Sequence, residues 1–306
     1  MANPPLAGAS GVLLLISLVA LVGLVVDPRE ITGQPAWAKP ARFGFSFAVY
    51  TLTLLWLLTF VQGRGFLVRV ISWVTAVTAV VEVLWVTGSA AGGTTSHFNF
   101  TTPGYSGLLI TMLVVISLLG LMALATIGLL LLQRVEPPQL AWALRLGLAV
   151  GVVGMAVGAL MVTPTAAQEA AADLGRGMPH IGAHSVGEPD GRPGMLLTNF
   201  STTAGDLRVA HFVGVHSLQV IVLLGLLLTL GPRTLGPRHR TALVVIAAVT
   251  CLGLIALTVW QARRTQPLFA PDMATSTAWI VLAVAVAAAT ATVFWHARAT
   301  RVNTVP

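Results

Sequence analysis

Long apolar stretches separated by short polar segments are the dominant pattern along this chain. A helix that crosses a bilayer needs about 20 mostly apolar residues, and eight stretches meet that length. Each is too long for a membrane strand, so the pattern predicts an all-α, polytopic transmembrane helical bundle that forms one membrane domain over residues 1–306. The predicted spans are 6–26, 43–62, 66–88, 107–132, 140–163, 208–230, 241–260 and 275–296.

The composition agrees with a lipid environment. Hydrophobic residues make up 56% of the chain and charged residues only 9%, whereas soluble domains carry about 25% charged residues. The net charge of +7 comes from basic residues spread thinly over the loops. We therefore expect the bilayer and its anionic headgroups as partners and no nucleic acid. The single cysteine, Cys251, lies in an apolar stretch and has no partner for an intrachain disulfide.

Loop charges predict the orientation. An even number of spans places both termini on one side, and the short loops on that side are rich in Arg, which favours cytoplasmic termini. The opposite side has the longer loops, above all an extracytoplasmic loop at 164–207. Thr165 and Gln168 have capping-box spacing there and predict a short helix that ends near Gly175. Lys39 is the sole lysine among many arginines, a usage typical of bacteria, so we expect a bacterial cytoplasmic membrane.

Three predicted spans carry polar residues at helical spacing in their outer halves. Residues spaced three and four apart share one helix face, and such a face does not favour lipid. We expect these faces to meet inside the bundle, in a polar pocket that opens outward. The polar positions are Lys39, Arg42, Ser46, Tyr50 and Thr53 in the second span, Thr75, Thr78, Glu82, Trp85 and Ser89 in the third, and Arg208, His211, His216 and Gln219 in the sixth.

Glu82 is the most informative of these residues. It lies about six residues, or about 9 Å, inside the outer end of its predicted span. A carboxylate at such a depth costs about 2.5–3.5 kcal/mol or more unless it is paired, protonated or hydrated. His216 lies at a similar depth, so the two side chains are expected to meet. Their roles would be metal ligand, proton relay or general base; the alternative is a buried interhelical hydrogen bond.

The histidines admit several interpretations. A five-residue spacing places His211 and His216 about 140° apart on a helix, so they cannot bind one metal as an HxxxH pair does. Either could bind haem axially or ligate a metal with help from other helices, or else hydrogen-bond within the core. A metal site that draws on His97, His184, His211 and Glu82 is physically possible, although no HExxH or CxxC signature is present.

Charged residues near the span ends have structural and functional interpretations. Asp206 stands where an N-cap of the sixth span would stand. Arg208, one turn on, could pair with Glu82, with Asp190 or with a substrate anion. Lys39 and Arg42 are expected to be interfacial anchors, with Pro40 in the first turn of the second span. Four glycines of the fifth span share one face and predict close helix packing: Gly147, Gly151, Gly154 and Gly158.

Several segments together resemble a family of bacterial eight-helix integral membrane proteins of unknown activity. The resemblance runs from the second span to the start of the eighth and implies a membrane location, without implying an activity. The segments that carry it are Trp37-Ala38-Lys39-Pro40, Ser96-His97-Phe98-Asn99, Gly205-Asp206-Leu207-Arg208 with His211 and His216, and Gln266-Pro267 followed by Pro271-Asp272.

Three functions fit these residues. The favoured one is a redox or enzymatic protein in which His211 or His216, helped by His97, Arg208 and Glu82, binds haem b or a divalent metal such as zinc. The second is a proton-coupled transporter or receptor for a small solute, with Glu82 and His216 as the proton-coupled pair and Arg208 as an anion contact. The third is a zinc-dependent membrane hydrolase acting on a lipid, with Glu82 as general base and a histidine-bound zinc that polarises water. The candidate catalytic residues are Glu82 and His216, and the ligands considered are a small molecule, a quinone and a lipid.

Overall fold

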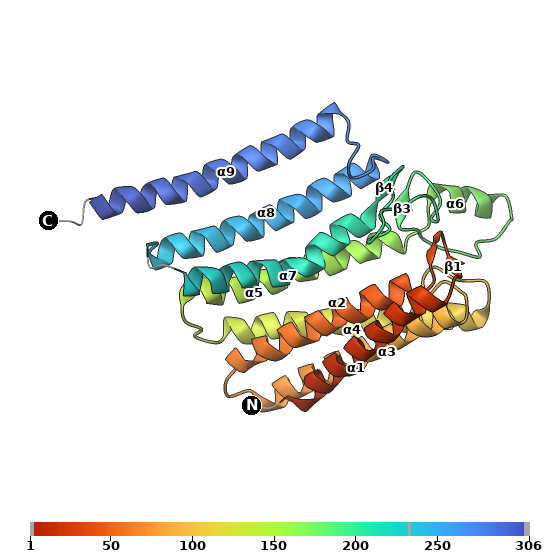
Figure 1. Cartoon of the computed structure of the whole chain (residues 1–306), viewed down its shortest axis with the longest axis horizontal. Coiled ribbons are helices and arrows are strands. Elements are labelled where there is room, and N and C mark those ends of the chain that lie inside the picture. Colours follow the sequence, from red (N-terminus) through yellow and green to blue (C-terminus); the bar gives the residue numbers. More distant parts are fainter. Residues whose placement is uncertain (1–2, 232–233, 303–306) are drawn as a thin grey trace. The chain divides into compact units, whose positions relative to one another are not determined.

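The computed structural model describes residues 3–231 and 234–302 and is built almost entirely of helices (Figure 1). Eight of its helices are long and apolar enough to cross a membrane, so the predicted all-α membrane bundle is confirmed. Orientation across the membrane stays a prediction, and the chain ends lie outside the described residues. The long helices are α1 (Pro4–Val26), α2 (Ala38–Leu57), α3 (Gly65–Ala91), α4 (Pro103–Leu131), α5 (Pro138–Val157), α7 (Leu207–Leu230), α8 (Pro237–Arg263) and α9 (Met273–Val302).

Short elements complete the chain. The strands β1 (Glu30–Ile31) and β2 (Gln34–Pro35) pair as an antiparallel hairpin. Single 3-10 turns, η1 (Leu58–Phe60) and η2 (Gly158–Met161), extend α2 and α5. The predicted loop 164–207 holds α6 (Ala166–Asp173), β3 (Ser185–Val186) and β4 (Gly205–Asp206).

The chain divides into two compact units, which we describe separately. The first unit comprises Met1–Thr126 and Ala159–Thr203, and the second comprises Ile127–Gly158 and Ala204–Pro306. Whether they act as one membrane domain, as the sequence predicts, stays a prediction.

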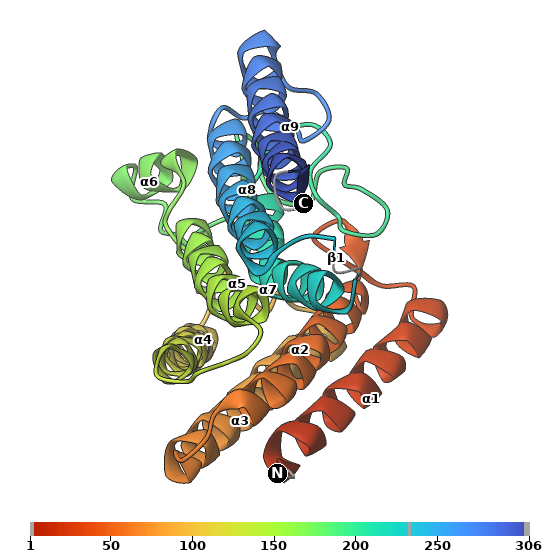
Figure 2. The ribbon, with the colours of Figure 1, turned by 90° about the vertical axis from the view of Figure 1, so that its left-hand side faces the viewer.

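In the first unit, α1, α2 and α3 pack against one another (Figures 1 and 2). Small residues bring α1 close to α2: a Cβ atom at Gly44 would lie 2.9 Å from the carbonyl oxygen of Leu13. Hydroxyl groups bridge the same pair, since Ser17 donates to the carbonyl of Ala41 and Ser10 shares a hydrogen bond with Thr51. These bonds satisfy polar groups that lipid would leave unpaired.

In the second unit, α5 and α7 cross at two glycines. A Cβ atom at Gly154 would lie 2.3 Å from the backbone of Gly214, and one at Gly147 would lie 3.1 Å from the carbonyl oxygen of Leu218. The predicted close packing of the fifth span is therefore confirmed. Figure 2 shows α8 between this pair and α9, and α9 is attached to α8 by hydrogen bonds from Trp279 to Gln261 and between His239 and His296.

The predicted helix in the long loop is confirmed as α6. Thr165 is its N-cap, the reciprocal Thr165–Gln168 capping box is present, and Gly175 follows the helix at a φ of 71°. Gln168 also holds the rest of the loop, since its amide group bonds to both the N–H and the carbonyl of Gly182. One side chain thus couples the start of α6 to a loop segment 14 residues away.

We expect Gln168→Ala to loosen α6 and the loop beside Gly182 together. The variant loses the bond that the Gln168 side chain accepts from the Thr165 N–H and leaves the Gly182 backbone groups unpaired, which should cost about 2 kcal/mol. Amide hydrogen exchange over residues 166–173 should then quicken ~30-fold. Glu169→Gln, an exposed change on the same turn, is the control and should leave the exchange rates unchanged. Equal rates in both variants would contradict this role of Gln168.

Candidate functional site

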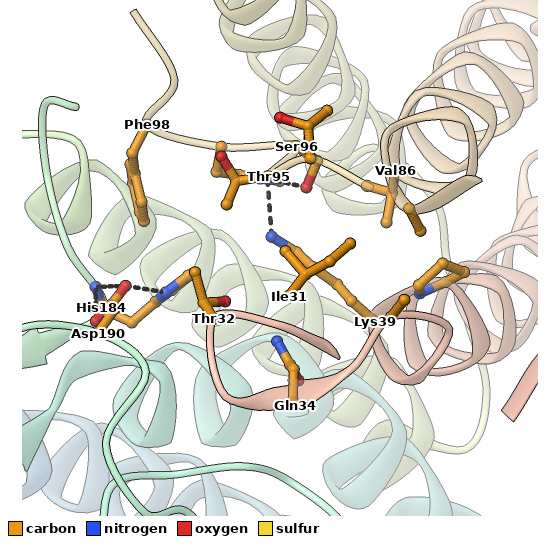
Figure 3. A pocket seen from close by; sticks show the side chains of 15 residues that line it. Ile31, Thr32, Gln34, Lys39, Val86, Thr95, Ser96, Phe98, His184 and Asp190 are labelled. Carbon is orange, nitrogen blue, oxygen red and sulfur yellow. Dashed lines mark hydrogen bonds and ion pairs between the residues drawn. The ribbon is translucent and has the colours of Figure 1, made fainter. Parts of the chain in front are cut away.

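A cavity of about 50 Å³ lies in the first unit, where the loops meet the ends of α2 and α3 (Figure 3). This volume holds a few water molecules. The walls come from the β1–β2 hairpin, the start of α2, the end of α3, the loop 94–98 and the long loop. The polar lining includes Gln34, Lys39, Thr95, Ser96, His97, His184 and Asp190.

Lys39 and His97 form the centre of this site. The Lys39 ammonium lies 3.0 Å from Nδ1 of His97, and the Ser96 hydroxyl lies 2.8 Å from the same nitrogen. An ammonium group can only donate, so Nδ1 accepts and the proton of neutral His97 lies on Nε2. Lys39, which the sequence predicts to be an interfacial anchor, lines the cavity instead (Figure 3).

The loop that carries His97 is fixed from both sides. The indole of Trp85 on α3 donates to the carbonyl of Ser96, and the carbonyl of Phe98 accepts from the N–H of Ile181. Phe98 itself has a φ of 64°, in the left-handed region that a bulky side chain rarely adopts. Such a conformation costs of order 1–3 kcal/mol and persists only where the surrounding contacts impose it. This strained residue lies directly at the cavity.

His184 and Asp190 form an ion pair on the same cavity wall (Figure 3). Nδ1 of His184 lies 2.6 Å from the Asp190 carboxylate, which also accepts from the backbone N–H groups of His184 and Ser185. Burial alone would raise the pKa of Asp190, but the hydrogen bonds and charge of His184 and the backbone N–H groups hold it well below its usual range. The carboxylate accepts a hydrogen bond at Nδ1, so His184 donates to Asp190 from this nitrogen.

The hairpin positions this wall. Thr32 and Gly33 form its two-residue turn with φ values of 49° and 68°, the signs required by a type I′ turn. A Cβ atom at Gly33 would lie 2.5 Å from the carbonyl oxygen of Gly191, so the hairpin and the segment after Asp190 approach closely only because residue 33 is a glycine.

Glu82 lies deeper in the same unit. Its side chain is buried, at 4% exposure, and its Oε2 atom has no hydrogen-bond partner among the residues that the structure describes. Since α3 extends to Ala91, Glu82 is about 13 Å from the helix end rather than the 9 Å expected. His216 belongs to the other unit, and the expected meeting of the two side chains stays a prediction.

The histidines of α7 have partners within the second unit. Nδ1 of His211 donates to the carbonyl oxygen of Gly154 at 2.8 Å, the interhelical bond considered as an alternative to ligation. The ring of His216 lies 4.4 Å from that of Phe212, measured between centroids. Arg208 forms a bidentate pair with Asp206, the N-cap of α7, an acid that the sequence analysis had not named as its partner.

The metal hypothesis gains no support. Over residues 3–231 and 234–302 there is no group of three or more His, Cys, Asp or Glu side chains that could hold a metal ion. His97 and His184, two of the predicted metal ligands, line the same cavity. However, Nδ1 of His97 is hydrogen-bonded to the Lys39 ammonium. The residues that sequence reasoning missed are Lys39, Gln34 and Asp190, and the unusual single lysine was the one available signal.

The fold and the cavity define the class: this is a multi-pass membrane protein with a polar, lysine-centred cavity beside its loops. Models of known protein families, curated proteins and solved structures contain no match to the chain.

Proposed function

We propose that this protein binds a small carboxylate in the cavity of the first unit and acts as a proton-coupled receptor or transporter for it. The supporting observation is the ammonium of Lys39, which lies in the cavity 3.0 Å from His97. Thr95, Ser96 and Gln34, which carry hydroxyl and amide groups, line the same cavity. This set of donors suits a carboxylate, which accepts several hydrogen bonds at once.

The charge at this site favours an anion over a metal or a haem iron. A divalent cation bound to Nε2 of His97 would lie across one imidazole ring from the Lys39 ammonium, and like charges at that range repel. Among the described residues that line the cavity, Asp190 alone has a carboxylate, and that carboxylate is engaged by His184 and two backbone N–H groups. An incoming anion therefore meets Lys39 as its counter-charge.

Glu82 gives this binding site its coupling to protons. A buried carboxylate with an unpartnered oxygen is costly in a membrane, and protonation removes that cost. A solute carboxylate at Lys39 brings a second negative charge into the same unit, so its binding is proposed to accompany protonation of Glu82. With cytoplasmic termini in a bacterial inner membrane, the cavity faces the periplasm and draws its solute from there.

The test is isothermal titration of acetate into the protein in lipid nanodiscs. Wild type should bind acetate and should not bind acetamide, which has the same shape without the charge. Lys39→Gln should weaken acetate binding at least tenfold, since a hydrogen bond to a charged group contributes about 1.5–3 kcal/mol. Arg176→Gln removes the same charge from an exposed position of the same unit and should bind as wild type.

Two results would overturn the proposal. One is acetate binding by Lys39→Gln that equals wild type. The other is a visible haem spectrum or stoichiometric zinc in the purified protein, since either would restore the cofactor hypothesis.

A further inference from the structure

Two adjacent leucines in the long loop are almost wholly exposed. Leu196 is 98% exposed and Leu197 is 83% exposed, so both side chains project away from the described part of the chain. Single exposed apolar side chains are ordinary on a protein surface, whereas neighbouring ones mark contact with a partner or a membrane. These two leucines lie outside the eight candidate spans, so membership of a membrane helix does not explain their exposure.

The segment that carries them, residues 194–201, has a defined fold, and we call it the leucine tip. Its first and last residues form an antiparallel bridge. The N–H of Met195 donates to the carbonyl of Phe200 at 2.9 Å, and the N–H of Asn199 donates to the carbonyl of Met195 at 2.8 Å. Backbone bonds therefore hold the two leucines in a fixed position.

Arg42 fixes the height of the leucine tip relative to the membrane. Its guanidinium donates to the carbonyl of Leu197 at 3.0 Å. Arg42 lies in the second turn of α2, directly before the apolar stretch that begins at Phe43. An arginine at the end of a span extends its charged group toward the lipid headgroups. The leucine tip is thus bonded to α2 at the level of the headgroups.

The face of α2 below Arg42 is apolar and exposed. Phe45 lies three residues further along the helix and Leu52 seven residues beyond Phe45, so all three share one face. Phe45 is 59% exposed and Leu52 45% exposed. Such a face on a membrane span suits acyl chains. The lipid that covers this face therefore lies directly below the bond between Arg42 and the leucine tip.

The charges around the leucine tip suit lipid phosphate groups. Arg192 is exposed two residues before the tip, and residues 191–204 contain no Asp or Glu. The nearest acid in the sequence, Asp190, is engaged by His184. A negatively charged headgroup therefore meets the guanidinium groups of Arg42 and Arg192 and no free carboxylate of this segment.

We propose that the leucine tip is a membrane anchor of the long loop. Leu196 and Leu197 insert into the bilayer leaflet beside this loop, while Arg42 and Arg192 contact its phosphate groups. Interfacial segments bind membranes in this way, with apolar side chains below the headgroups and basic ones among them. Because the tip follows Asp190 closely in the chain, the anchor ties one wall of the cavity to the bilayer. It does not depend on the proposed binding of a carboxylate.

The test is spin labelling of the full chain in nanodiscs of phosphatidylcholine and phosphatidylglycerol. The single cysteine, Cys251, is first replaced by alanine, and Leu196→Cys then carries the nitroxide label. Oxygen concentrates among acyl chains and a nickel chelate stays in water, so the ratio of their collision rates with the label reports its depth. This ratio should be about fivefold higher at Leu196→Cys than at Glu169→Cys, an exposed charged position of α6. Phe45→Cys supplies the reference for lipid.

A second labelling site and a folding check keep the result clear. Leu197→Cys should give the same high ratio as Leu196→Cys, and slow exchange of the Met195 amide verifies that the leucine tip keeps its fold in each variant. Equal ratios at Leu196→Cys and Glu169→Cys would overturn the anchor, because the tip would then lie in water.

Low collision rates with both reagents would also overturn the anchor. The leucine tip would then be covered by protein, either a second copy of the chain or another partner. None of these results bears on acetate binding, so the anchor and the proposed solute function can fail separately.

Discussion

Gly154→Val is expected to abolish folding of the second unit around the α5–α7 crossing. A Cβ atom at residue 154 would lie 2.3 Å from the backbone of Gly214, and the clash is reciprocal, since a Cβ at Gly214 would lie 2.2 Å from Gly154. Backbone cannot move aside as a flexible side chain can, so the helices must separate. The separation also breaks the bond from His211 to the Gly154 carbonyl. We expect a loss of more than about 3 kcal/mol.

Thermal unfolding followed by size-exclusion chromatography in detergent measures this effect. Gly151→Val is a matched control on the same helix, because the Cβ there would lie 3.9 Å from the Cβ of Leu218, an ordinary contact. The control should keep an unfolding temperature close to that of wild type, while Gly154→Val should elute as aggregate. Similar elution of the two variants as folded protein would contradict the glycine crossing.

The sequence predicted the helices because each apolar stretch is a local signal. It placed their starts too late, since the first turns are polar and hydropathy alone excludes them. α8 begins at Pro237 rather than near 241, and α5 begins at Pro138. In both helices the proline occupies an early position where its missing N–H costs nothing, a signal that marks these starts better than hydropathy does.

Local polar spacing was as informative as hydropathy. The Thr165–Gln168 capping box and the Asp206 cap each depend on residues two or three positions apart, and both are confirmed. The second bond of Gln168, to Gly182, connects residues 14 positions apart, and no local pattern contains it.

Local patterns pointed to individual residues near the cavity but not to the contacts between them. His97, His184 and Glu82 attract attention by residue type, and the first two do line one cavity. The contact that defines the cavity joins Lys39 to His97 across 58 positions of sequence. Its geometry depends on a left-handed Phe98, which no propensity favours. Such long-range pairing is settled by packing of the whole unit, so sequence spacing cannot reveal it.

Asp190→Asn is expected to destabilise the loop segment around His184 that forms one wall of the cavity. The carboxylate accepts from the His184 ring at 2.6 Å and from the N–H groups of His184 and Ser185 at 2.9–3.1 Å. Hydrogen bonds to a charged group contribute about 1.5–3 kcal/mol. Exchange of the His184 and Ser185 amides should therefore quicken about 10- to 100-fold in the variant at pH 7. Glu188→Gln, the same charge change in the same loop, should leave both amides protected.

In the wild-type protein, the protection of these two amides should depend on pH, and the pKa of Asp190 sets the direction of the change. Because the pKa of Asp190 is held well below its usual range, the folded loop favours the carboxylate form. Its stabilisation is complete above the pKa of a free aspartate, about 3.9, and is lost only as the pH falls through the lower folded pKa. Protection of the two amides, corrected for intrinsic exchange, should decline as the pH falls below about pH 4. In Asp190→Asn it should be low and independent of pH. If protection in wild type did not decline below about pH 4, the Asp190 carboxylate would not be the group that closes this wall.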